Sequence, residues 1–285
     1  MKTIKNNIKL SIIVLNYKNP ELTLKCLNLL IKELDKSKIS REIILVDNSS
    51  LESGDFFEKH LSMDASNITL IKNKKNLGFA TANNQGIRIS KGEYILLLNN
   101  DIFIKNGKVI SKGLDYFESH KDTGIWSPAL LNKNKIIQKT TGKKPSLLGL
   151  IHEYYLFNIF DKYKDFKRIT NVDTVIGAFW LIHSSTVKKI GLLDEDYFFT
   201  SEDIDYCNRI NEEGLKIIYD PDIRGVVHLG GASQTWDWLR DPYLHKSRML
   251  YFKKNRNYIS FILSKYIIKS GLYYRKAITK VRNNK

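Results

Sequence analysis

Cysteine is scarce in this chain, and long apolar runs are absent. Only Cys26 and Cys207 occur among 285 residues, and neither lies in a metal-type or redox-type spacing. We therefore expect no disulfide framework and a reducing compartment. No stretch approaches the roughly 20 apolar residues that a membrane-spanning helix needs. The apolar run at residues 10–15 is too short for a signal peptide, so we expect a buried strand there and a cytoplasmic protein.

Glycine is missing from the turn between the first predicted strand and the first predicted helix, Asn-Tyr-Lys-Asn-Pro at residues 16–20. A dinucleotide-binding Rossmann domain carries its glycine fingerprint at this position, and a P-loop also needs glycine to hold phosphates. The sequence therefore argues against both kinds of nucleotide site.

Acidic residues are few relative to basic ones. The chain has 46 Lys and Arg against 30 Asp and Glu, a formal charge of +16. This excess favours an anionic partner, which is nucleic acid, a membrane surface or a phosphorylated substrate. No zinc-ligand spacing or aromatic RNA-binding motif is found, so we expect no nucleic-acid partner.

The charge imbalance is greatest in the tail, residues 246–285, which contains 12 Lys and Arg and no Asp or Glu. Apolar side chains recur there at helical spacing, with Lys265 and Lys269 away from that face. The pattern is typical of an amphipathic helix lying on anionic lipid, and equally of a helix packed on the main domain with a solvated basic face. The apolar positions are Ile259, Ile262, Leu263, Tyr266 and Ile267.

The first half of the chain alternates apolar strands with amphipathic helices. Strands are predicted at residues 10–16, 42–47, 68–72 and 94–98, and helices at residues 79–89 and after Asn19 and Pro20. Such alternation indicates an α/β fold with a mainly parallel sheet flanked by helices. Ligands bind at the carboxyl ends of such strands, where Asn16, Asp47 and the triplet at residues 99–101 fall.

The second half is less regular. Residues 131–170 are loose, basic and aromatic, and we interpret them as a variable insertion. A strand is predicted at residues 175–183 and helices at 184–190 and 201–213, the last capped by Ser201. Two short strands are predicted at residues 216–219 and 225–228.

Asn99-Asn100-Asp101 follows an apolar strand directly. A carboxylate there is well placed to hold a hard divalent cation against a diphosphate. An ordinary Asn/Asp turn after a strand is the alternative, and for the triplet alone it is the better one.

Residues 200–205 place three carboxylates at the start of a helix. Helix capping explains acids at this position, because the helix dipole favours them. The alternative is that Asp203 acts as a general base on a hydroxyl group. The pattern does not separate the two.

His228 ends a predicted strand and precedes Gly230 and Gly231. A single histidine is more often structural than a ligand, but a neutral imidazole binds divalent cations, and the glycines permit close approach of a phosphate.

Taken together and in order, these segments resemble the family-2 glycosyltransferases, which have the GT-A fold, a mixed and mainly parallel Rossmann-like sheet. The resemblance is greatest to the bacterial rhamnosyltransferase-like branch, and it covers most of residues 10–233. The matching segments are SIIVLNYKNPELTLKCL, EIILVDNSS, NLGFATANNQGI, GEYILLLNND, GAFWLIHSSTVKKIGLLDEDYFFTSEDIDYCNRINEEGLKIIYDP and VVHLGGAS.

The resemblance implies a role for each matching residue. Asp101 matches the last carboxylate of the family's DxD metal motif, whose first acid is replaced here by Asn99, so His228 becomes the second metal ligand. Asp203 matches the catalytic base, and Glu202 a neighbour that holds the acceptor. The implied donor-site residues are Asn16, Tyr17, Asp47, Asn48, Asn76, Gly78, Asn84, Asn99 and Asn100, and the implied sugar-stacking residues are Trp180 and Trp236.

The implied activity is inverting transfer of a sugar from a nucleotide-diphosphate donor, with Mg²⁺ or Mn²⁺, to a cell-surface polysaccharide or lipid-linked saccharide. dTDP-L-rhamnose is the first expectation for the donor and a UDP-hexose the second. We expect a catalytic domain at residues 1–245, with a nucleotide-binding half (1–130) and a catalytic and acceptor half (171–233), followed by a basic helical extension (246–285) that lies on anionic membrane.

Three other functions were weighed against this one. A sugar nucleotidyltransferase would have a glycine- and arginine-rich loop after the first strand, where this chain has none. A basic nucleic-acid-binding protein would show strongly salt-dependent binding. An inactive membrane-docked scaffold would have no reason to retain Asp101, Asp203 and His228.

Overall fold

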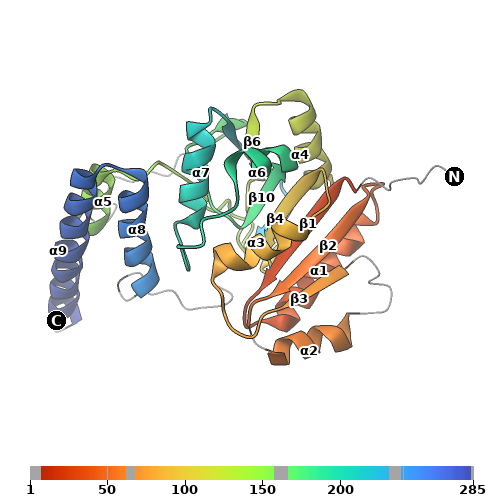
Figure 1. Ribbon diagram of the computed structural model, residues 1–285, viewed down its shortest axis with the longest axis horizontal. Helices are drawn as coiled ribbons and strands as arrows, with labels where there is room; N and C mark the ends of the chain where they lie inside the picture. Colours follow the sequence, from red (N-terminus) through yellow and green to blue (C-terminus); the bar gives the residue numbers. More distant parts are fainter. Residues whose placement is uncertain are drawn as a thin grey trace.

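A central eight-stranded sheet, flanked by helices, forms the body of the protein (Figure 1). The computed structural model describes residues 8–49, 51–61, 68–156, 166–230, 239 and 241–283. The strand order is β3-β2-β1-β4-β10-β6-β11-β8. The strands are β1 (Leu10–Asn16), β2 (Arg41–Asp47), β3 (Ile68–Lys72), β4 (Tyr94–Asn99), β6 (Thr123–Pro128), β8 (Thr170–Asn171), β10 (Phe179–His183) and β11 (Lys216–Asp220).

The sheet is mixed but mainly parallel, as the sequence predicts. β1 pairs in parallel with β2 and β4, β2 with β3, and β6 with β11. β10 runs antiparallel to both β4 and β6, so it begins beside the end of β4. Two small antiparallel pairs complete the strands: β5 (Ile102–Ile104) with β12 (Val226–His228), and β7 (Thr141–Gly142) with β9 (Thr174–Val175).

Helices cover both faces of the sheet. One hydrophobic core packs α1, α2 and α4 on one face, and a second packs α3, α6 and α7 on the other. The helix α1 begins where expected, because the Asn19 side chain accepts a hydrogen bond from Leu22 N at 3.2 Å and Pro20 occupies the first turn. These helices are α1 (Pro20–Leu34), α2 (Leu51–His60), α3 (Phe79–Ile89), α4 (Lys108–Ser119), α6 (Ser184–Ile190) and α7 (Glu202–Glu212).

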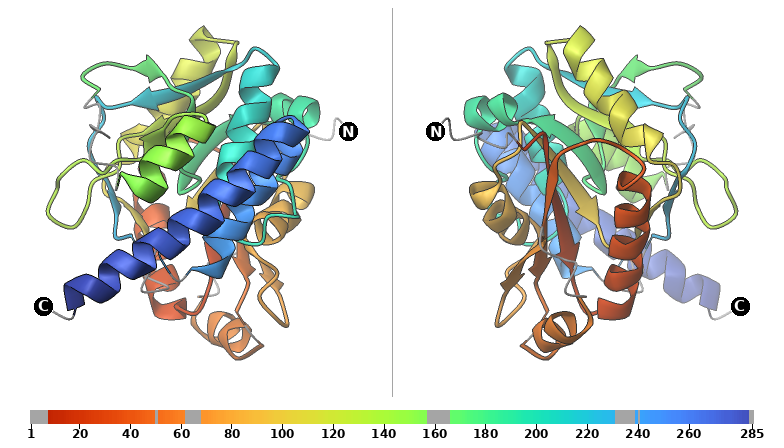
Figure 2. Two further views of the ribbon diagram at one scale, coloured as in Figure 1. Left: turned by 90° about the vertical axis from the view of Figure 1, so that its left-hand side faces the viewer. Right: turned by 90° about the vertical axis from the view of Figure 1, so that its right-hand side faces the viewer.

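Three further helices, α5 (Leu147–Tyr155), α8 (Pro242–Asn255) and α9 (Tyr258–Asn283), lie together at one end of the molecule (Figures 1 and 2). They share a third core that contains Tyr154, Phe252 and Ile268. Gly271 allows α9 to approach α5, because a Cβ atom at this position would lie 2.5 Å from Tyr154 Cβ. No helix in the described ranges is both long and apolar enough to cross a membrane.

Several expectations from the sequence need correction. The segment at residues 131–170 is not only loop, since it contains α5 and β7. The strand expected at residues 175–183 is two strands, with Gly177 between them. Ser201 makes no capping hydrogen bond, because its backbone is left-handed, with φ 68°. The expected boundary between residues 245 and 246 falls inside α8.

Candidate active site

Polar side chains from three adjacent strands meet at the carboxyl edge of the sheet. Asn16 at the end of β1 lies opposite Asp47 at the end of β2, and Leu15 lies opposite Asn99 at the end of β4. Parallel pairing therefore gathers these predicted donor-site residues at one edge, where α/β sheets bind ligands. Asn99 and the nearby Tyr17 are partly exposed there.

Asn16, Asp47 and Asn100 belong to one buried hydrogen-bond network. Asn16 Nδ2 donates to Asp47 Oδ1 at 2.7 Å, and Thr23 Oγ1 donates to Asn16 Oδ1 at 2.7 Å. Asn100 Nδ2 donates to Thr23 Oγ1 at 2.8 Å, and Ser53 Oγ donates to Asp47 Oδ2 at 2.6 Å. The network holds the three strand ends at fixed positions, and its contact with a nucleotide stays a prediction.

Asn48, Asn76 and Gly78 form the turn before α3. Asn48 Nδ2 and Gly78 N both donate to Asn76 Oδ1, at 2.8 and 2.9 Å. Gly78 has φ 87°, and a Cβ atom there would lie 2.5 Å from Phe198 O. Glycine is therefore required both for the backbone conformation and for the approach of the loop at residues 192–200.

Asn84, predicted to line the donor site, holds this same loop. It is fully buried. Its Nδ2 donates to Leu193 O at 2.8 Å, and its Oδ1 accepts from Leu193 N at 3.0 Å. Nδ2 also donates to Glu195 Oε1 at 2.9 Å. Asn84 therefore positions the loop that precedes α7, rather than presenting an amide to a ligand.

Pairing of β5 with β12 brings Asp101 and His228 together. His228 lies opposite Ile102, and Leu229 N donates to Asp101 O at 3.0 Å. His228 Nε2 lies 3.5 Å from Asp101 Oδ2. Both side chains are largely buried, and Asp101 Oδ1 has no hydrogen-bond partner within the described part of the chain. A buried carboxylate oxygen left unpaired beside an imidazole nitrogen fits the ligand set of a divalent cation.

The electrostatics of His228 agree with that role. Burial lowers its pKa, although the nearby Asp101 carboxylate opposes the shift. The imidazole is therefore neutral at physiological pH, which is the form that ligates metals. Among the residues that the structure describes, no group of three or more His, Cys, Asp or Glu is suited to a metal. Asp101 and His228 would thus hold the ion as a pair, with oxygen atoms of a diphosphate completing its shell.

Asp203 lies in the first turn of α7. Its Oδ1 accepts from Ile204 N at 2.8 Å, and its Oδ2 accepts from Gly177 N at 3.4 Å. Burial raises the pKa of Asp203, while the two backbone donors oppose the shift. Gly177 precedes β10, where Asn99 N donates to Ala178 O at 3.0 Å. These contacts place Asp203 beside the strand end that leads into Asp101.

Glu202 is buried beside Asp203. Its Oε2 has no hydrogen-bond partner among the described residues. Burial, followed by the Asp203 charge, raises the pKa of Glu202 well above its ordinary value. Glu202 therefore keeps its proton while Asp203 is ionised. The preceding Thr200 and Ser201 have φ 66° and 68°, a strained conformation of the kind found at functional turns.

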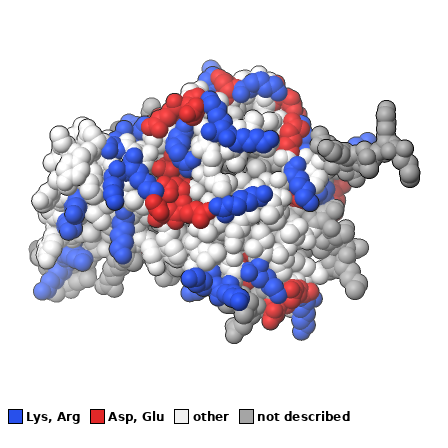
Figure 3. Space-filling view, in the orientation of Figure 1, with Lys and Arg blue, Asp and Glu red and all other residues white. Residues whose placement is uncertain are grey.

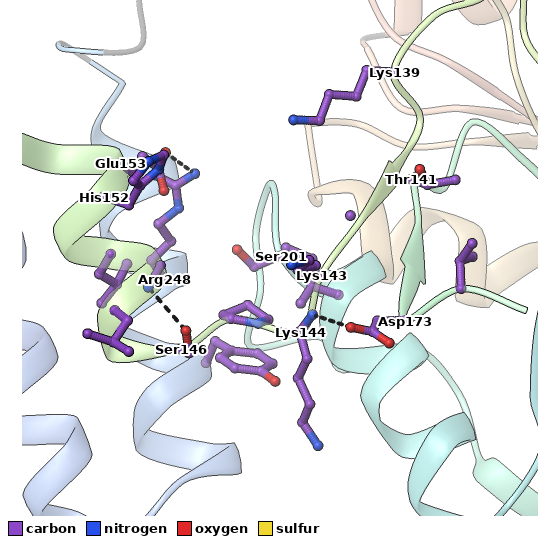
Figure 4. Close-up of a pocket in the computed structure, with 18 of the residues that line it drawn as sticks. Lys139, Thr141, Lys143, Lys144, Ser146, His152, Glu153, Asp173, Ser201 and Arg248 are labelled. Carbon is purple, nitrogen blue, oxygen red and sulfur yellow. Dashed lines mark hydrogen bonds and ion pairs between the residues drawn. The ribbon is translucent and has the colours of Figure 1, made fainter. Parts of the chain in front are cut away.

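A cavity of about 890 Å³ opens beside the start of α7. It is bounded by residues 139–146, α5 and α8, and it reaches Ser201 and Ile204 (Figure 4). Lys139, Lys143 and Lys144 line one side of it, and Figure 4 shows the Lys139 side chain extending into the space. Sequence reasoning missed this cavity by treating the segment as a variable insertion, although its three lysines close together mark an anion-binding segment.

The two tryptophans expected to stack on sugar rings are not confirmed. Trp180 is fully buried and its ring stacks on Tyr206, with 5.7 Å between centroids, so an acceptor sugar cannot reach it. Its expected role is corrected to core packing. Trp236 lies outside the described residues.

Comparison with known proteins agrees with this arrangement. The model of Glycosyl transferase family 2 matches residues 11–191. The low-salt glycan biosynthesis hexosyltransferase Agl10 of Haloferax volcanii is 30% identical over 227 residues, 73% of this chain and 63% of that protein. The dTDP-rhamnosyl transferase RfbF of Shigella flexneri is 26% identical over 290 residues, 98% of this chain and 91% of that protein.

Among solved structures, the chain resembles GalNAc-T7 crystallised with UDP, GalNAc and Mn²⁺. The TM-score is 0.66 at 13% identity, covering 87% of this chain and 49% of that one. This likeness shows the GT-A fold. Because the family model spans well over half of the sequence and RfbF matches nearly all of it, the chain belongs to glycosyltransferase family 2, in its rhamnosyltransferase-like branch.

Proposed function

We propose that this glycosyltransferase uses a divalent cation, Mg²⁺ or Mn²⁺, and inverts the anomeric carbon of the sugar that it transfers. One observation carries the proposal. The unpaired Asp101 oxygen and the neutral His228 imidazole lie at the same edge of the sheet as Asp203, whose pKa is raised. This edge thus combines a site for a leaving diphosphate with a base for an attacking hydroxyl group.

Each group has a separate part in the reaction. Asp203 accepts the proton of an acceptor hydroxyl as its oxygen bonds to the anomeric carbon from the face opposite the diphosphate. The bond from that carbon to the diphosphate oxygen breaks at the same time, and the nucleoside diphosphate leaves. A cation held by Asp101 and His228 would offset the charge that develops on the leaving group. Protonated Glu202 can donate a hydrogen bond to the acceptor.

For the donor, we propose dTDP-L-rhamnose first, supported by the similarity to RfbF along 98% of the chain, and a UDP-hexose second. The test is a donor screen that follows nucleoside-diphosphate release with Mg²⁺ or Mn²⁺ present and with a saccharide acceptor. The proposal expects acceptor-dependent release from at least one donor and loss of release with a chelator. Release that survives exhaustive chelation would contradict the metal requirement.

For the acceptor, we propose a cell-surface saccharide or lipid-linked saccharide that enters the cavity beside α7. The lysines on its wall favour an acceptor with a phosphate or diphosphate group. Lys143 is exposed, and Lys144 Nζ lies 3.7 Å from Glu212 Oε1.

Replacing Lys143 and Lys144 together by alanine should raise the KM for a phosphate-linked acceptor. Each exposed cation contributes up to about 1 kcal/mol to an ion pair, so the expected rise is up to about thirtyfold. The KM for the donor, and the KM for a neutral saccharide with the same terminal sugar, should not change. Equal losses with the charged and neutral acceptors would show that the lysines do not bind the phosphate.

We also propose that α9 binds an anionic membrane surface. Its inner face, with Ser264 and Ile268, is buried against neighbouring helices, whereas Ile259 and Tyr266 on the outer face are each 69% exposed. Thus both interpretations of the tail contribute, since α9 packs on α5 and α8 and still presents an apolar outer surface. Over this end of the molecule, Figure 3 shows Lys and Arg without Asp or Glu. Apolar side chains flanked by cations suit a lipid interface.

Replacing Lys265 and Lys269 by glutamine should weaken binding to vesicles that contain anionic lipid. Each cation near such a surface contributes about 1 kcal/mol, so we expect about thirtyfold weaker partitioning in a sedimentation assay. Lys188 and Lys189 on α6 supply the matched control, because replacing both removes the same charge from an exposed site on another helix. Equal effects of the two double variants would show only a dependence on net charge.

A further inference from the structure

We propose that Gln138 is a positioning residue that selects the tautomer of His228 and so turns the lone pair of Nε2 toward the cation site. The inference rests on the proposed metal role of His228. It concerns a residue from the segment expected to be a variable insertion, well separated in sequence from both ligands.

Two hydrogen bonds define the orientation of the Gln138 amide. Its Nε2 lies 2.9 Å from His228 O, and because a carbonyl oxygen only accepts, the atom facing it must be the amide nitrogen. The amide oxygen, Oε1, therefore faces His228 Nδ1, at 2.7 Å. That oxygen also only accepts, so Nδ1 must carry the hydrogen.

The consequence falls on the other ring nitrogen. A neutral imidazole has one N–H group, so a hydrogen on Nδ1 leaves Nε2 with a lone pair. Nε2 faces Asp101 Oδ2 at 3.5 Å, longer than an ordinary N–H···O hydrogen bond. In this tautomer neither atom donates to the other. A lone pair and a carboxylate oxygen side by side are mutually favourable only when a cation lies between them.

The backbone around Gln138 is well anchored. Gln138 N donates to Leu130 O at 2.8 Å, and His228 N donates to Leu131 O at 2.8 Å. Leu131 forms bridges with both Ile137 and Val227, so the short hairpin that carries Gln138 is joined directly to β12. The amide is thus held before any ligand arrives, as expected for a group that orients a metal-binding histidine.

A purely structural role is the competing explanation, in which the two hydrogen bonds only attach the hairpin to β12. Replacing Gln138 by methionine keeps the length of the side chain and removes both bonds, whereas Gln138→Glu keeps an acceptor for Nδ1. We expect Gln138→Met to bind Mn²⁺ about ten- to a hundredfold more weakly in a calorimetric titration with a nucleoside diphosphate. Gln138→Glu should retain an affinity within a few-fold of the unsubstituted protein.

The tautomer itself gives a second measurement. Imidazole ¹⁵N chemical shifts of the folded, metal-free protein should show His228 protonated on Nδ1, and Gln138→Met should shift the population toward Nε2. Protonation on Nε2 in the unsubstituted protein would overturn the inference, whether or not any variant folds. So would an unchanged Mn²⁺ affinity in a folded Gln138→Met protein.

Asp101→Asn separates this inference from the proposed function. If Asp101→Asn abolishes Mn²⁺ binding and Gln138→Met leaves it unchanged, the metal site holds and the role of Gln138 is wrong. If Asp101→Asn also binds Mn²⁺ normally, the proposed metal site is itself wrong.

Discussion

Sugar transfer should fall by about a hundred- to ten-thousand-fold when Asp203 is replaced by asparagine, because that is the usual contribution of a general base. The substitution preserves the shape of the side chain, and the two backbone groups that donate to Asp203 can still donate to the amide oxygen. The fold should therefore survive. The measurement is the transfer rate with donor and acceptor at saturation, together with a thermal unfolding curve.

Glu213→Gln is the matched control for Asp203→Asn. It removes one carboxylate charge just beyond the other end of the same helix, where Glu213 is exposed and pairs with Lys189 at 3.1 Å. Its transfer rate should be close to that of the unsubstituted protein. A folded Asp203→Asn protein with normal turnover would rule out this residue as the base.

The same carboxylate predicts the pH dependence of transfer. Burial raises the pKa of Asp203, and transfer requires the ionised form. As pH falls, the active form is therefore lost at a higher pH than the value of about 4 expected for an ordinary aspartate. A plot of the transfer rate against pH should show an acid limb displaced upward from that value, and the residual activity of Asp203→Asn should lack it.

Replacing Asp101 by asparagine should lower transfer by at least about a thousandfold. Stabilisation of a leaving diphosphate by a metal amounts to several kcal/mol, and about 1.4 kcal/mol corresponds to a factor of ten in rate. Asparagine removes the only carboxylate of the proposed ligand pair and leaves the buried site without its charge. The measurement is the rate of nucleoside-diphosphate release as Mn²⁺ is titrated.

Asp115→Asn serves as the control for Asp101→Asn, since Asp115 is an exposed aspartate on α4 and loses the same charge. It should keep the metal dependence of the unsubstituted protein. High concentrations of Mn²⁺ should restore part of the activity of Asp101→Asn if His228 still binds the ion. Identical metal titrations for Asp101→Asn and Asp115→Asn would remove Asp101 from the proposed site.

Much of the fold was predictable from local patterns. The bounds of β1, β3, α3 and α6 agree with the sequence prediction to the residue, because continuous apolar runs end there at polar residues or glycine. The helix α5 was missed. Its sequence, LLGLIHEYY, lacks a clear polar face, and its packing depends on α9, which lies far along the chain.

The functional residues divide in the same way. Asn16, Asp47 and Asp101 could be assigned to one edge from sequence, because the ends of parallel strands meet wherever such a sheet forms. The site of Trp180 could not, since an aromatic ring at a strand position packs in the core or faces a ligand depending on its neighbours. In this protein Tyr206 of α7 covers it.

Local residue order was therefore enough to establish a parallel α/β sheet and the kinds of side chain at its edge. The 3.5 Å contact between Asp101 and His228, and the hold of Gln138 on that imidazole, required the folded chain. They depend on pairing between very short strands and a hairpin distant in sequence. The register of such segments is set by the packing around them rather than by any pattern of their own.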